Sequence, residues 1–323
     1  MRPVSPRLEP RVCRSRRRLR PGRSRLGRSR LGRSKLGRGI TLPEVLVLVV
    51  IAGILLCLLL PALVRGREMT RKNLCEARIT KLIRCVQKFE SLSGTFPAGS
   101  INPTGPIANE PNGELHHSWI TQLLPFMDEP TTFEKINPEL SVYDDNHKFV
   151  RATLIPTLVC PGSPPPDSSK SLVVRPSSYA ACYHDQEQPL DGDNNGVFFL
   201  NSKLTQKDIH DGMEYTLFLG EVRLHADEPN LGWMSGTRAT LRNTGKPPNS
   251  SELAIEQRDK FYMGTFGSWH AGMTHMAMGN GRVTAVSNSI DPIAYQQLGG
   301  RKDGAVVPDG ASTPASADTP SGK

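Results

Sequence analysis

The chain has 323 residues, of which 37% are hydrophobic, and a formal net charge of +9. Its charge is uneven: residues 1–38 hold 15 Lys and Arg and one Glu, whereas the remainder holds 25 basic and 30 acidic residues, a net −5. An acidic remainder excludes a basic nucleic-acid-binding body, and the modest apolar content excludes a protein with many membrane spans. This length accommodates one large or two small domains.

Residues 1–39 form an Arg-rich leader in which a five-residue unit repeats from residue 22. The leader has too few apolar groups to build a core, which predicts disorder in water. Its charge would suit the phosphates of a nucleic acid. Position favours another interpretation, because basic residues directly before an apolar span hold that end in the cytoplasm. We therefore expect no nucleic-acid partner.

An apolar span follows the leader. Val45–Val64 is 20 residues without a charge, about 30 Å long as a helix and therefore long enough to cross a bilayer. Apolar side chains then recur at steps of three and four, from Leu74 or Cys75 to Phe89, with basic residues between them. This pattern predicts a transmembrane helix over residues 40–64 that continues as an amphipathic helix over residues 65–92.

Two residues of the span are unusual for a simple anchor, Glu44 at its start and Pro61 near its end. Thr41 and Glu44 have the spacing of a capping box, in which each side chain binds the other residue's backbone N–H. That role accounts for Glu44 in a soluble helix, but a carboxylate beside lipid needs a partner. An N-terminal amine created by cleavage after Gly39 would be such a partner. Pro61 removes a helical hydrogen bond near the far membrane face.

The body, residues 93–303, alternates brief apolar runs with Gly, Pro, Asn and Asp, which predicts an α+β head with an antiparallel sheet. The expected strands are Thr153–Val159, Leu172–Val174, Gly196–Leu200, Thr216–Val222, Thr274–Met278 and Arg282–Ser287. The last two flank Gly279-Asn280-Gly281, whose Asn-Gly pair is typical of a type I′ hairpin turn. Short helices are expected at Ser118–Met127 and Pro292–Leu298. The composition of residues 304–323 predicts a disordered tail.

The six cysteines show no C-x-x-C spacing, so a structural zinc site is not expected. Cys160 and Cys182 lie in the body and are the disulfide candidates if the body is exported. The alternative is that both are unpaired and pack as small hydrophobic residues.

An acidic loop and a cluster of His and Met raise the question of a metal. Residues 191–196 repeat the first half of a calcium loop, but Ser202 stands where an EF-hand has its bidentate acid, which excludes an EF-hand. Asp191, Asp193 and Asn195 remain candidates for a looser calcium site. The alternative is that they form a simple acidic turn. The His and Met residues of 270–278 alternate as a half-buried strand does, which favours no soft-metal site. We expect no cofactor.

The sequence nominates no catalytic constellation. Residues 116–117 and 184–185 contain histidines, yet no nucleophile stands at a convincing spacing from them. We therefore expect a protein that is not an enzyme.

The stretch from Lys35 to Glu44, followed by an apolar helix, resembles the N-terminus of type IV prepilins and pseudopilins. The resemblance implies that prepilin peptidase cuts after Gly39 and methylates Ile40. Glu44 then becomes the fifth mature residue, as that family expects, and Gly53 and Pro61 take the fourteenth and twenty-second places, where pilins often have Gly and Pro. Two departures are Ile40 in place of the usual phenylalanine and Pro43 in place of an aliphatic residue.

A series of motifs in the body resembles the planctomycete prepilin-like proteins, a family classed as a domain of unknown function, over about residues 39–300. These motifs are Gly94-Thr95-Phe96-Pro97-Ala98-Gly99, Ser118-Trp119, Val159-Cys160-Pro161, Ser178-Tyr179-Ala180, Leu219-Gly220-Glu221 and Phe266-Gly267-Ser268-Trp269-His270. The family's C-terminal signature is His, nine residues and then Asp-Gly. Here His270 is followed by nine residues and then Asn280-Gly281, so Asn replaces Asp.

Together these features imply a single-pass protein of the inner membrane with a cytoplasmic leader and a periplasmic head of pilin-like fold. The expected function is that of a structural subunit of a pilus or a type II secretion-like pseudopilus, assembled with like or related pilin-type subunits through Glu44, Gly53 and Pro61. The alternative is a membrane-tethered periplasmic protein that binds a solute or carbohydrate and uses only the pilin-type signal. An arginine-rich nucleic-acid binder, the third hypothesis, would keep its leader.

Overall fold

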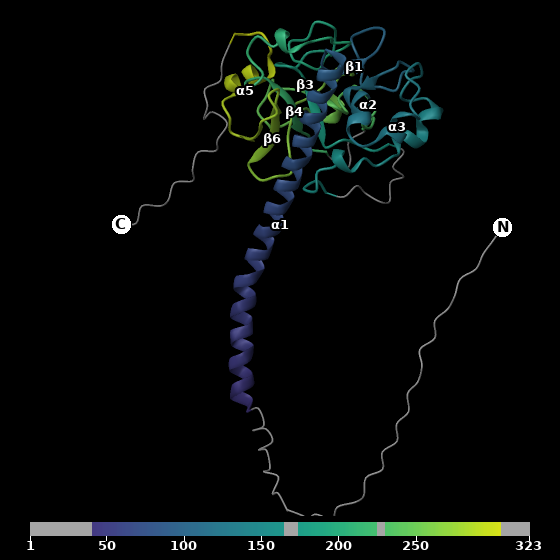
Figure 1. Cartoon of the computed structure of the whole chain (residues 1–323). Helices are drawn as coiled ribbons and strands as arrows, with labels where there is room; N and C mark the ends of the chain where they lie inside the picture. Colours follow the sequence, from purple (N-terminus) through teal and green to yellow (C-terminus); the bar gives the residue numbers. More distant parts are fainter. Residues whose placement is uncertain (1–40, 165–173, 225–229, 305–323) are drawn as a thin grey trace, which may run out of the picture. The chain divides into compact units, whose positions relative to one another are not determined.

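The computed structural model describes residues 41–164, 174–224 and 230–304. The expectations for the leader, including cleavage after Gly39 and methylation of Ile40, lie outside these residues, as does the predicted tail from residue 305. The chain divides at Cys57 into two units, which are described separately. The fold is mixed α+β, with a long apolar N-terminal helix and a mostly antiparallel sheet (Figure 1).

Helix α1, Leu42–Ser93, begins directly after Thr41, as the capping-box pattern predicts. The Glu44 carboxylate accepts from the Thr41 backbone N–H at 2.8 Å and from the Thr41 hydroxyl at 2.9 Å. The glutamate half of the box is therefore confirmed, while the hydroxyl donates to Glu44 instead of accepting from its N–H. Gly94, with φ +80°, ends the helix. The helix continues through Pro61.

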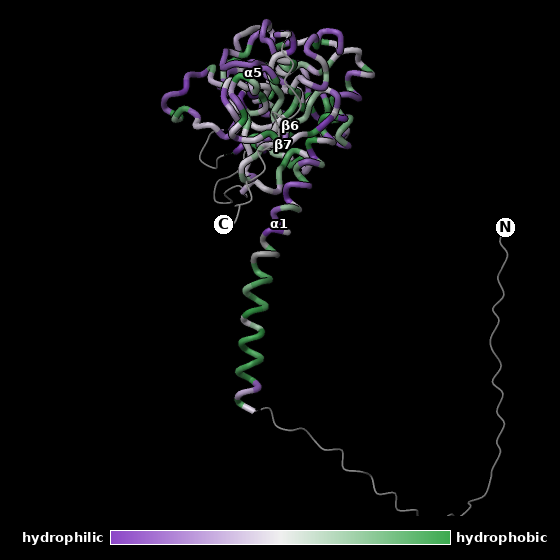
Figure 2. The backbone as a smooth tube through the Cα atoms, turned by 90° about the vertical axis from the view of Figure 1, so that its left-hand side faces the viewer, coloured by the Kyte–Doolittle hydropathy of each residue, from purple (hydrophilic) through white to green (hydrophobic). Residues whose placement is uncertain are grey.

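The first part of α1 is apolar and exposed. Every side chain from Leu42 to Leu60 is exposed, and Figure 2 shows this part of the chain as mostly hydrophobic. By length and composition α1 is suited to cross a membrane.

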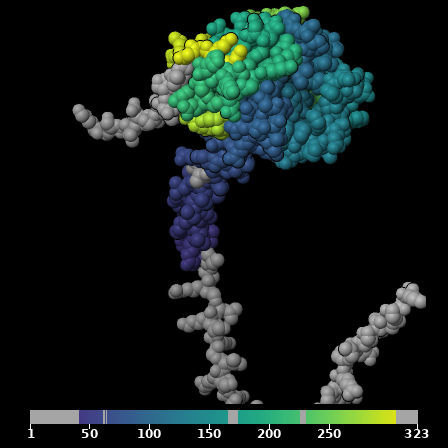
Figure 3. Space-filling view, turned by 45° about the horizontal axis from the view of Figure 1, so that its top comes forward, coloured from purple at the N-terminus to yellow at the C-terminus, as the bar shows by residue number. Residues whose placement is uncertain are grey.

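The later turns of α1 are amphipathic and belong to the core of the body. Their fully buried side chains lie at the predicted spacing and are Cys75, Ile79, Leu82, Ile83 and Val86. Leu74 is 46% exposed, so Cys75 and not Leu74 begins the buried stripe. Figure 3 shows that part of these turns, in blue, lies at the surface of the body.

The main sheet has five strands in the order β5-β3-β4-β6-β7. Its strands are β3 (Tyr179–His184), β4 (Leu217–Glu221), β5 (Leu241–Asn243), β6 (Met273–Met278) and β7 (Val283–Ser287). All neighbours are antiparallel except β3 and β5. A second sheet pairs β1 (Ser100–Ile101) with β2 (His117–Ser118).

The sheet has a core on each face. On β3, Tyr179, Ala181 and Tyr183 join the core that contains α1, whereas Ala180 and Cys182 join a second core with Tyr295 of α5, Pro292–Gly299. Successive strand residues point to opposite faces, so this division follows from the strand geometry.

Three of the expected strands are confirmed, namely β4, β6 and β7. The expected strand Thr153–Val159 is wrong, because Pro156 begins a 3-10 turn, η3, Pro156–Leu158. The expected strand Gly196–Leu200 is also wrong, since it forms only an isolated bridge from Leu200 to Ser100. Leu172–Val174 lies almost wholly outside the described residues. Strands β3 and β5 were not predicted: β3 contains two alanines, which are depleted in strands, and no Val or Ile, and β5 has three residues of which one is apolar.

The β6–β7 hairpin is confirmed, but its turn is not type I′. Gly281 N donates to the Met278 carbonyl at 2.9 Å, and Met278 N donates to the Arg282 carbonyl at 2.9 Å. Of the three loop residues only Gly281 has a positive φ, +91°. This is a three-residue loop with glycine in the left-handed region, where a side chain would be strained.

The expected short helices are confirmed as α5 and as α2, Trp119–Leu123, which Ser118 caps and which continues into the 3-10 turn η1, Leu124–Phe126. The remaining short helical pieces are α3 (Pro130–Phe133), α4 (Lys148–Arg151), η2 (Asp145–His147), η4 (Gln206–Asp208) and η5 (Ile255–Gln257).

Candidate functional site

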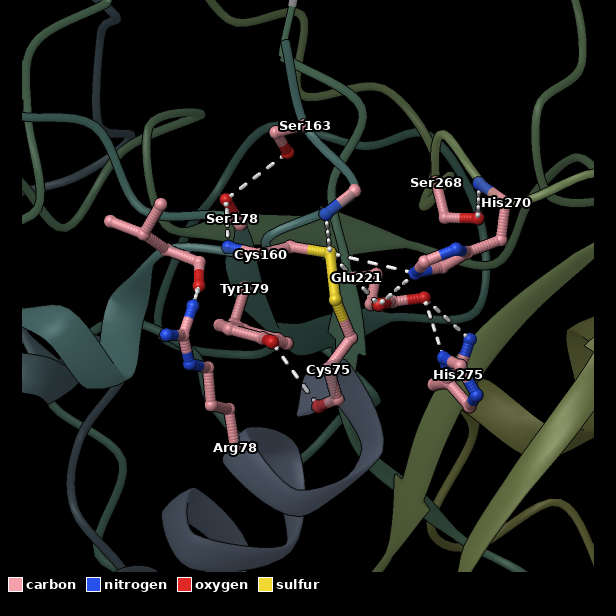
Figure 4. Close-up of a disulfide and its surroundings, with 12 residues drawn as sticks. Cys75, Arg78, Cys160, Ser163, Ser178, Tyr179, Glu221, Ser268, His270 and His275 are labelled. Carbon is pink, nitrogen blue, oxygen red and sulfur yellow. Dashed lines mark hydrogen bonds and ion pairs between the residues drawn. A yellow bond between two sulfur atoms is a disulfide. The ribbon is translucent and has the colours of Figure 1, made fainter. Parts of the chain in front are cut away.

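A disulfide joins Cys75 of α1 to Cys160, two residues after η3, with 5.3 Å between their Cα atoms (Figure 4). The candidate pairing of Cys160 with Cys182 is therefore wrong, and the alternative of unpaired cysteines holds for Cys182 but not for Cys160. Cys182 has a free, fully buried thiol on β3 that points into the core with α5, on the opposite face of the sheet from Cys160. The period of two along β3 excludes the expected bond.

Hydrogen bonds hold the backbone around both half-cystines. Cys160 N donates to the Ser178 hydroxyl at 2.9 Å, and the Tyr179 hydroxyl donates to the Cys75 carbonyl at 3.2 Å. Arg78, on the next turn of α1 after Cys75, donates to the carbonyl of Val159. The two sulfurs are thus placed by α1, by the loop after η3 and by the start of β3.

A buried carboxylate and two histidines lie beside the disulfide (Figure 4). Glu221 ends β4, His275 lies in the adjacent strand β6, and His270 lies in the bend before β6. Glu221 Oε2 is 3.1 Å from His275 Nδ1 and accepts from His275 N at 2.8 Å. Glu221 Oε1 is 3.5 Å from His270 Nε2, which is 3.5 Å from Cys160 Sγ.

The other ring nitrogen of His270 faces α1. His270 Nδ1 is 3.2 Å from Oε1 of Glu68, whose side chain is 40% exposed. His270 therefore lies between a carboxylate of the helix and a carboxylate of the sheet. We call Glu68, Cys75, Cys160, Glu221, His270 and His275 the helix–sheet junction.

The electrostatics of the junction favour an ion pair. Burial would raise the pKa of the Glu221 carboxyl, but hydrogen bonds from His270 and His275 outweigh it and hold that pKa below its usual range. Burial would lower the pKa of His270, yet the hydrogen bonds and charges of Glu221 and Glu68 raise it. The arrangement thus favours an imidazolium at His270 between two carboxylates.

The signature residues His270, Asn280 and Gly281 lie at opposite ends of β6 and are not brought together. His270 belongs to the junction, while the hairpin loop contacts α1 elsewhere: Gln87 Nε2 donates to the Gly279 carbonyl at 2.9 Å. The two contacts lie beyond opposite ends of β6, and Glu68 and Gln87 are about 29 Å apart along the helix. The signature spacing therefore matches two contacts of one strand with one helix.

The calcium candidates Asp191, Asp193 and Asn195 lie in a tight turn. The Asp191 carboxylate accepts from Gly192 N at 2.7 Å, and Asp191 N donates to the Asn194 side chain at 2.7 Å. Backbone N–H groups are thus hydrogen-bonded to the side-chain oxygens of Asp191 and Asn194, as in a simple acidic turn. Among the described residues, the group of His, Cys, Asp and Glu whose ligand atoms approach one another closely is Cys75, Cys160, Glu221 and His270.

Of the junction residues, the sequence analysis identified only Cys160 and His270 as site candidates. Glu221 lay within a recognised motif, but nothing in its local spacing linked it to a histidine 49 positions further on. Glu68 and Cys75 belong to a helical pattern that predicts packing alone. The sequence signal that could have linked these residues is that Glu221 and His270 both belong to the same series of motifs.

A family model described as "Protein of unknown function (DUF1559)", SBP_bac_10, matches residues 65–293. The match begins in α1 and ends in α5, and it contains every residue of the helix–sheet junction. None of the curated proteins and none of the solved structures compared with the chain matches it.

Proposed function

The chain belongs to the DUF1559 family of proteins of unknown function, and on that premise we propose that it is a membrane-anchored, prepilin-like structural subunit. Prepilin peptidase cuts the precursor after Gly39 and methylates Ile40. The mature protein crosses the inner membrane once, with the leader side in the cytoplasm and the body in the periplasm. There it acts in a pilus or a type II secretion-like pseudopilus and catalyses no reaction.

The observation that carries this proposal is the contrast between the two parts of α1. The side chains of residues 45–60 are apolar and exposed, which suits lipid or a bundle of like helices. Further along, Cys75 is covalently bonded to the body and Glu68 pairs with buried His270. A subunit whose helix packs with its neighbours needs a helix that cannot separate from its head, and these contacts supply that attachment.

The disulfide supports the periplasmic location. Disulfides persist in oxidising compartments such as the periplasm and are rare in the cytoplasm. A head on the side opposite the Arg-rich leader meets that condition. The proposed periplasmic location is therefore consistent with the disulfide.

Glu44 is the residue through which we propose that subunits join. In this structure its carboxylate accepts hydrogen bonds from the backbone N–H and the hydroxyl of Thr41. In an assembly the same carboxylate would pair with the N-terminal amine of a neighbouring subunit, because a charge removed from water needs a partner. Gly53 fits close helix packing, since it is exposed on the helix and its lack of a side chain lets a neighbouring helix approach closely. Pro61, the third assembly position of the pilin pattern, lies on the same helix.

One observation favours the second function, binding of a solute or carbohydrate by a tethered head. A polar cavity of about 340 Å³ is lined by residues that include Arg223, Asn249, Glu252 and Arg258. Phe266 also lines the cavity, and an aromatic side chain beside a few polar groups is typical of ligand sites.

Substitution of Glu44 separates the two functions. We expect Glu44→Ala to stay in the membrane but to lose the cross-links between subunits that the wild type gives in native membranes. Glu76→Ala is the matched control, because Glu76 is another exposed glutamate of α1 outside the apolar part. If Glu44→Ala cross-links as well as Glu76→Ala does, the subunit function is wrong and the tethered binding protein is favoured.

A further inference from the structure

The helix–sheet junction contains the donor set of a metal site. We propose that, once the disulfide is reduced, Cys75 Sγ, Cys160 Sγ, His270 Nε2 and Glu221 Oε1 bind one Zn²⁺ ion. This second state of the junction does not depend on the pilus proposal.

The spacing of the donor atoms fits tetrahedral zinc. Zinc bonds are about 2.3 Å to sulfur and about 2.0–2.2 Å to nitrogen and oxygen, which places neighbouring donors about 3.6 Å apart for S–N and S–O pairs and about 3.4 Å for an N–O pair. Cys160 Sγ is 3.5 Å from His270 Nε2 and 3.7 Å from Glu221 Oε1, and the latter two atoms are 3.5 Å apart. Three edges of the tetrahedron are therefore already present.

The fourth donor is adjacent. All four donor atoms, that of Cys75 included, lie within 4.8 Å of one another. The two sulfurs, once released from their bond, need to stand about 3.8 Å apart in a tetrahedral site. All four residues are at most 5% exposed, so the donors are shielded from water as in structural zinc sites.

The groups behind the ligands have the arrangement of an outer coordination shell. Ligand histidines usually donate their second ring N–H to a carboxylate, which fixes the tautomer and leaves the other nitrogen for the metal. Glu68 Oε1, 3.2 Å from His270 Nδ1, stands in that position. Glu221 Oε2 is held by His275 through its backbone N–H and its ring, so Oε1 is the oxygen that faces the sulfurs.

The backbone also fixes the His270 ring. A Cβ placed at Gly162 would lie 2.7 Å from His270 Cε1, so the loop after Cys160 packs directly against the ring at Cε1. Since Gly162 N also approaches Cys160 Sγ at 3.4 Å, one short loop positions two of the four donors.

The change of state is a thiol–disulfide exchange. A dithiol reductant gives two electrons and two protons to the Cys75–Cys160 bond, becomes a disulfide itself and leaves two thiols. Zinc then displaces both thiol protons, together with any proton on His270 Nε2, and binds the two thiolates, the imidazole and the carboxylate. A disulfide oxidant reverses the change by exchange: it takes two electrons from the two thiolates and two protons from water, becomes a dithiol, and the re-formed Cys75–Cys160 bond releases the ion.

Zinc is the ion that this donor set favours. Two thiolates with imidazole and carboxylate suit a borderline-soft, four-coordinate ion, whereas calcium and magnesium require six or more oxygen donors in wider sites. The site could not be recognised from a C-x-x-C spacing, because its ligands come from four separate segments: α1, the loop after η3, β4 and the bend before β6.

The test uses the full chain in detergent micelles, without an affinity tag, in its oxidised form and after anaerobic reduction with a phosphine. Each form is titrated with Co²⁺, which reports four-coordination by its visible bands and thiolate binding by a near-ultraviolet charge-transfer band, and then with Zn²⁺. We expect one ion per reduced chain and none per oxidised chain. Because the oxidised chain has the same sequence, it is an internal control for metal binding elsewhere.

Variants assign the ligands. Cys75→Ser/Cys160→Ser should abolish the charge-transfer band, whereas Cys182→Ser, which alters a buried free thiol on the other face of the sheet, should retain it. His275→Gln, in the outer shell, should weaken binding about 10–100-fold, and His270→Gln by more than that. Equal Co²⁺ spectra for reduced wild type and Cys75→Ser/Cys160→Ser would overturn the proposal.

A second measurement covers the case in which reduction unfolds the chain. Zn²⁺ added to the reduced protein should then restore the folded circular dichroism spectrum for the wild type but not for His270→Gln. Restoration in both, or in neither, contradicts the site.

Discussion

Glu68 and His270 are 202 positions apart in the sequence, yet their side chains meet at 3.2 Å, one from helix α1 and the other from the bend before β6. Seven residues further along α1, Cys75 is bonded to Cys160. The helix that carries the apolar segment is thus joined to the body by a disulfide and an ion pair placed two turns apart.

The disulfide should account for a large share of the stability of the body. Closure of a chain segment between two positions that are 85 apart in the sequence restricts the unfolded state, and loss of such a bond costs about 2–5 kcal/mol. We expect Cys75→Ser/Cys160→Ser to lower the free energy of unfolding by that amount in urea titrations of the chain in detergent micelles. Tryptophan fluorescence reports the body, because Trp119 and Trp233 are buried there.

Added reductant is the control for this prediction. It should destabilise the wild type, measured with a metal chelator present, and leave the double variant unchanged. Equal stability of oxidised and reduced wild type would show that the bond does not constrain the unfolded chain.

The two carboxylates at His270 should differ in what they contribute. Glu221 is 1% exposed and Glu68 is partly exposed. Loss of one partner of a buried pair costs about 3–5 kcal/mol, whereas an exposed pair contributes about 1 kcal/mol or less. We expect Glu221→Ala to be several times more destabilising than Glu68→Ala in the same urea titrations. A larger effect of Glu68→Ala would contradict the burial argument.

The junction should give the oxidised, metal-free protein a stability plateau in mildly acidic solution. The pKa of Glu221 is lowered on folding, so its contribution is complete above its ordinary pKa of 4.5 and is lost as the pH falls through the folded value. The pKa of His270 is raised on folding, so its contribution is complete below its ordinary pKa of 6.5 and is lost as the pH rises through the folded value. Both contributions are complete between pH 4.5 and 6.5.

Urea titrations across the pH range, with a chelator present, check this plateau. In the variant Glu221→Gln the acid-side loss of stability should shrink, because the carboxyl that titrates there is gone. An unchanged profile in Glu221→Gln would mean that other groups determine the pH dependence.

Gly162 should resist any side chain. A Cβ on Gly162 would meet His270 Cε1 at 2.7 Å, closer than such atoms normally approach. A Cβ on Gly192 would lie in open space. We expect Gly162→Ala to cost about 1–3 kcal/mol by overpacking and Gly192→Ala to change stability by less than about 0.5 kcal/mol. Thermal unfolding of the two variants side by side measures the difference, and equal melting temperatures would contradict the contact.

How far the sequence predicts this structure depends on the kind of signal. The uncharged run before Arg65 and the apolar steps from Cys75 to Phe89 are local patterns, and both predicted α1. The β6–β7 hairpin was predicted from the Asn-Gly pair between two short apolar runs. Strand β3, Tyr179–His184, was missed because it has two alanines and no Val or Ile, whereas β4, which is equally buried, is a run of large apolar side chains.

The candidate site was predicted only in part, for a related reason. Cys160 and His270 were identified one at a time, but their partners come from α1 and β4, which only the fold brings near. The choice between Cys75 and Cys182 as partner of Cys160 depends on which face of β3 a side chain takes, and that face was unknown while β3 itself was unrecognised. Long-range pairs of this kind follow from topology and not from spacing.

The central claim is that the chain is a processed, prepilin-like subunit, and the mature N-terminus tests it most directly. Intact mass and N-terminal peptide mass spectrometry of the protein from native membranes would measure it. The account predicts a chain that begins at N-methylated Ile40. A membrane-bound protein that retains residues 1–39 would contradict it.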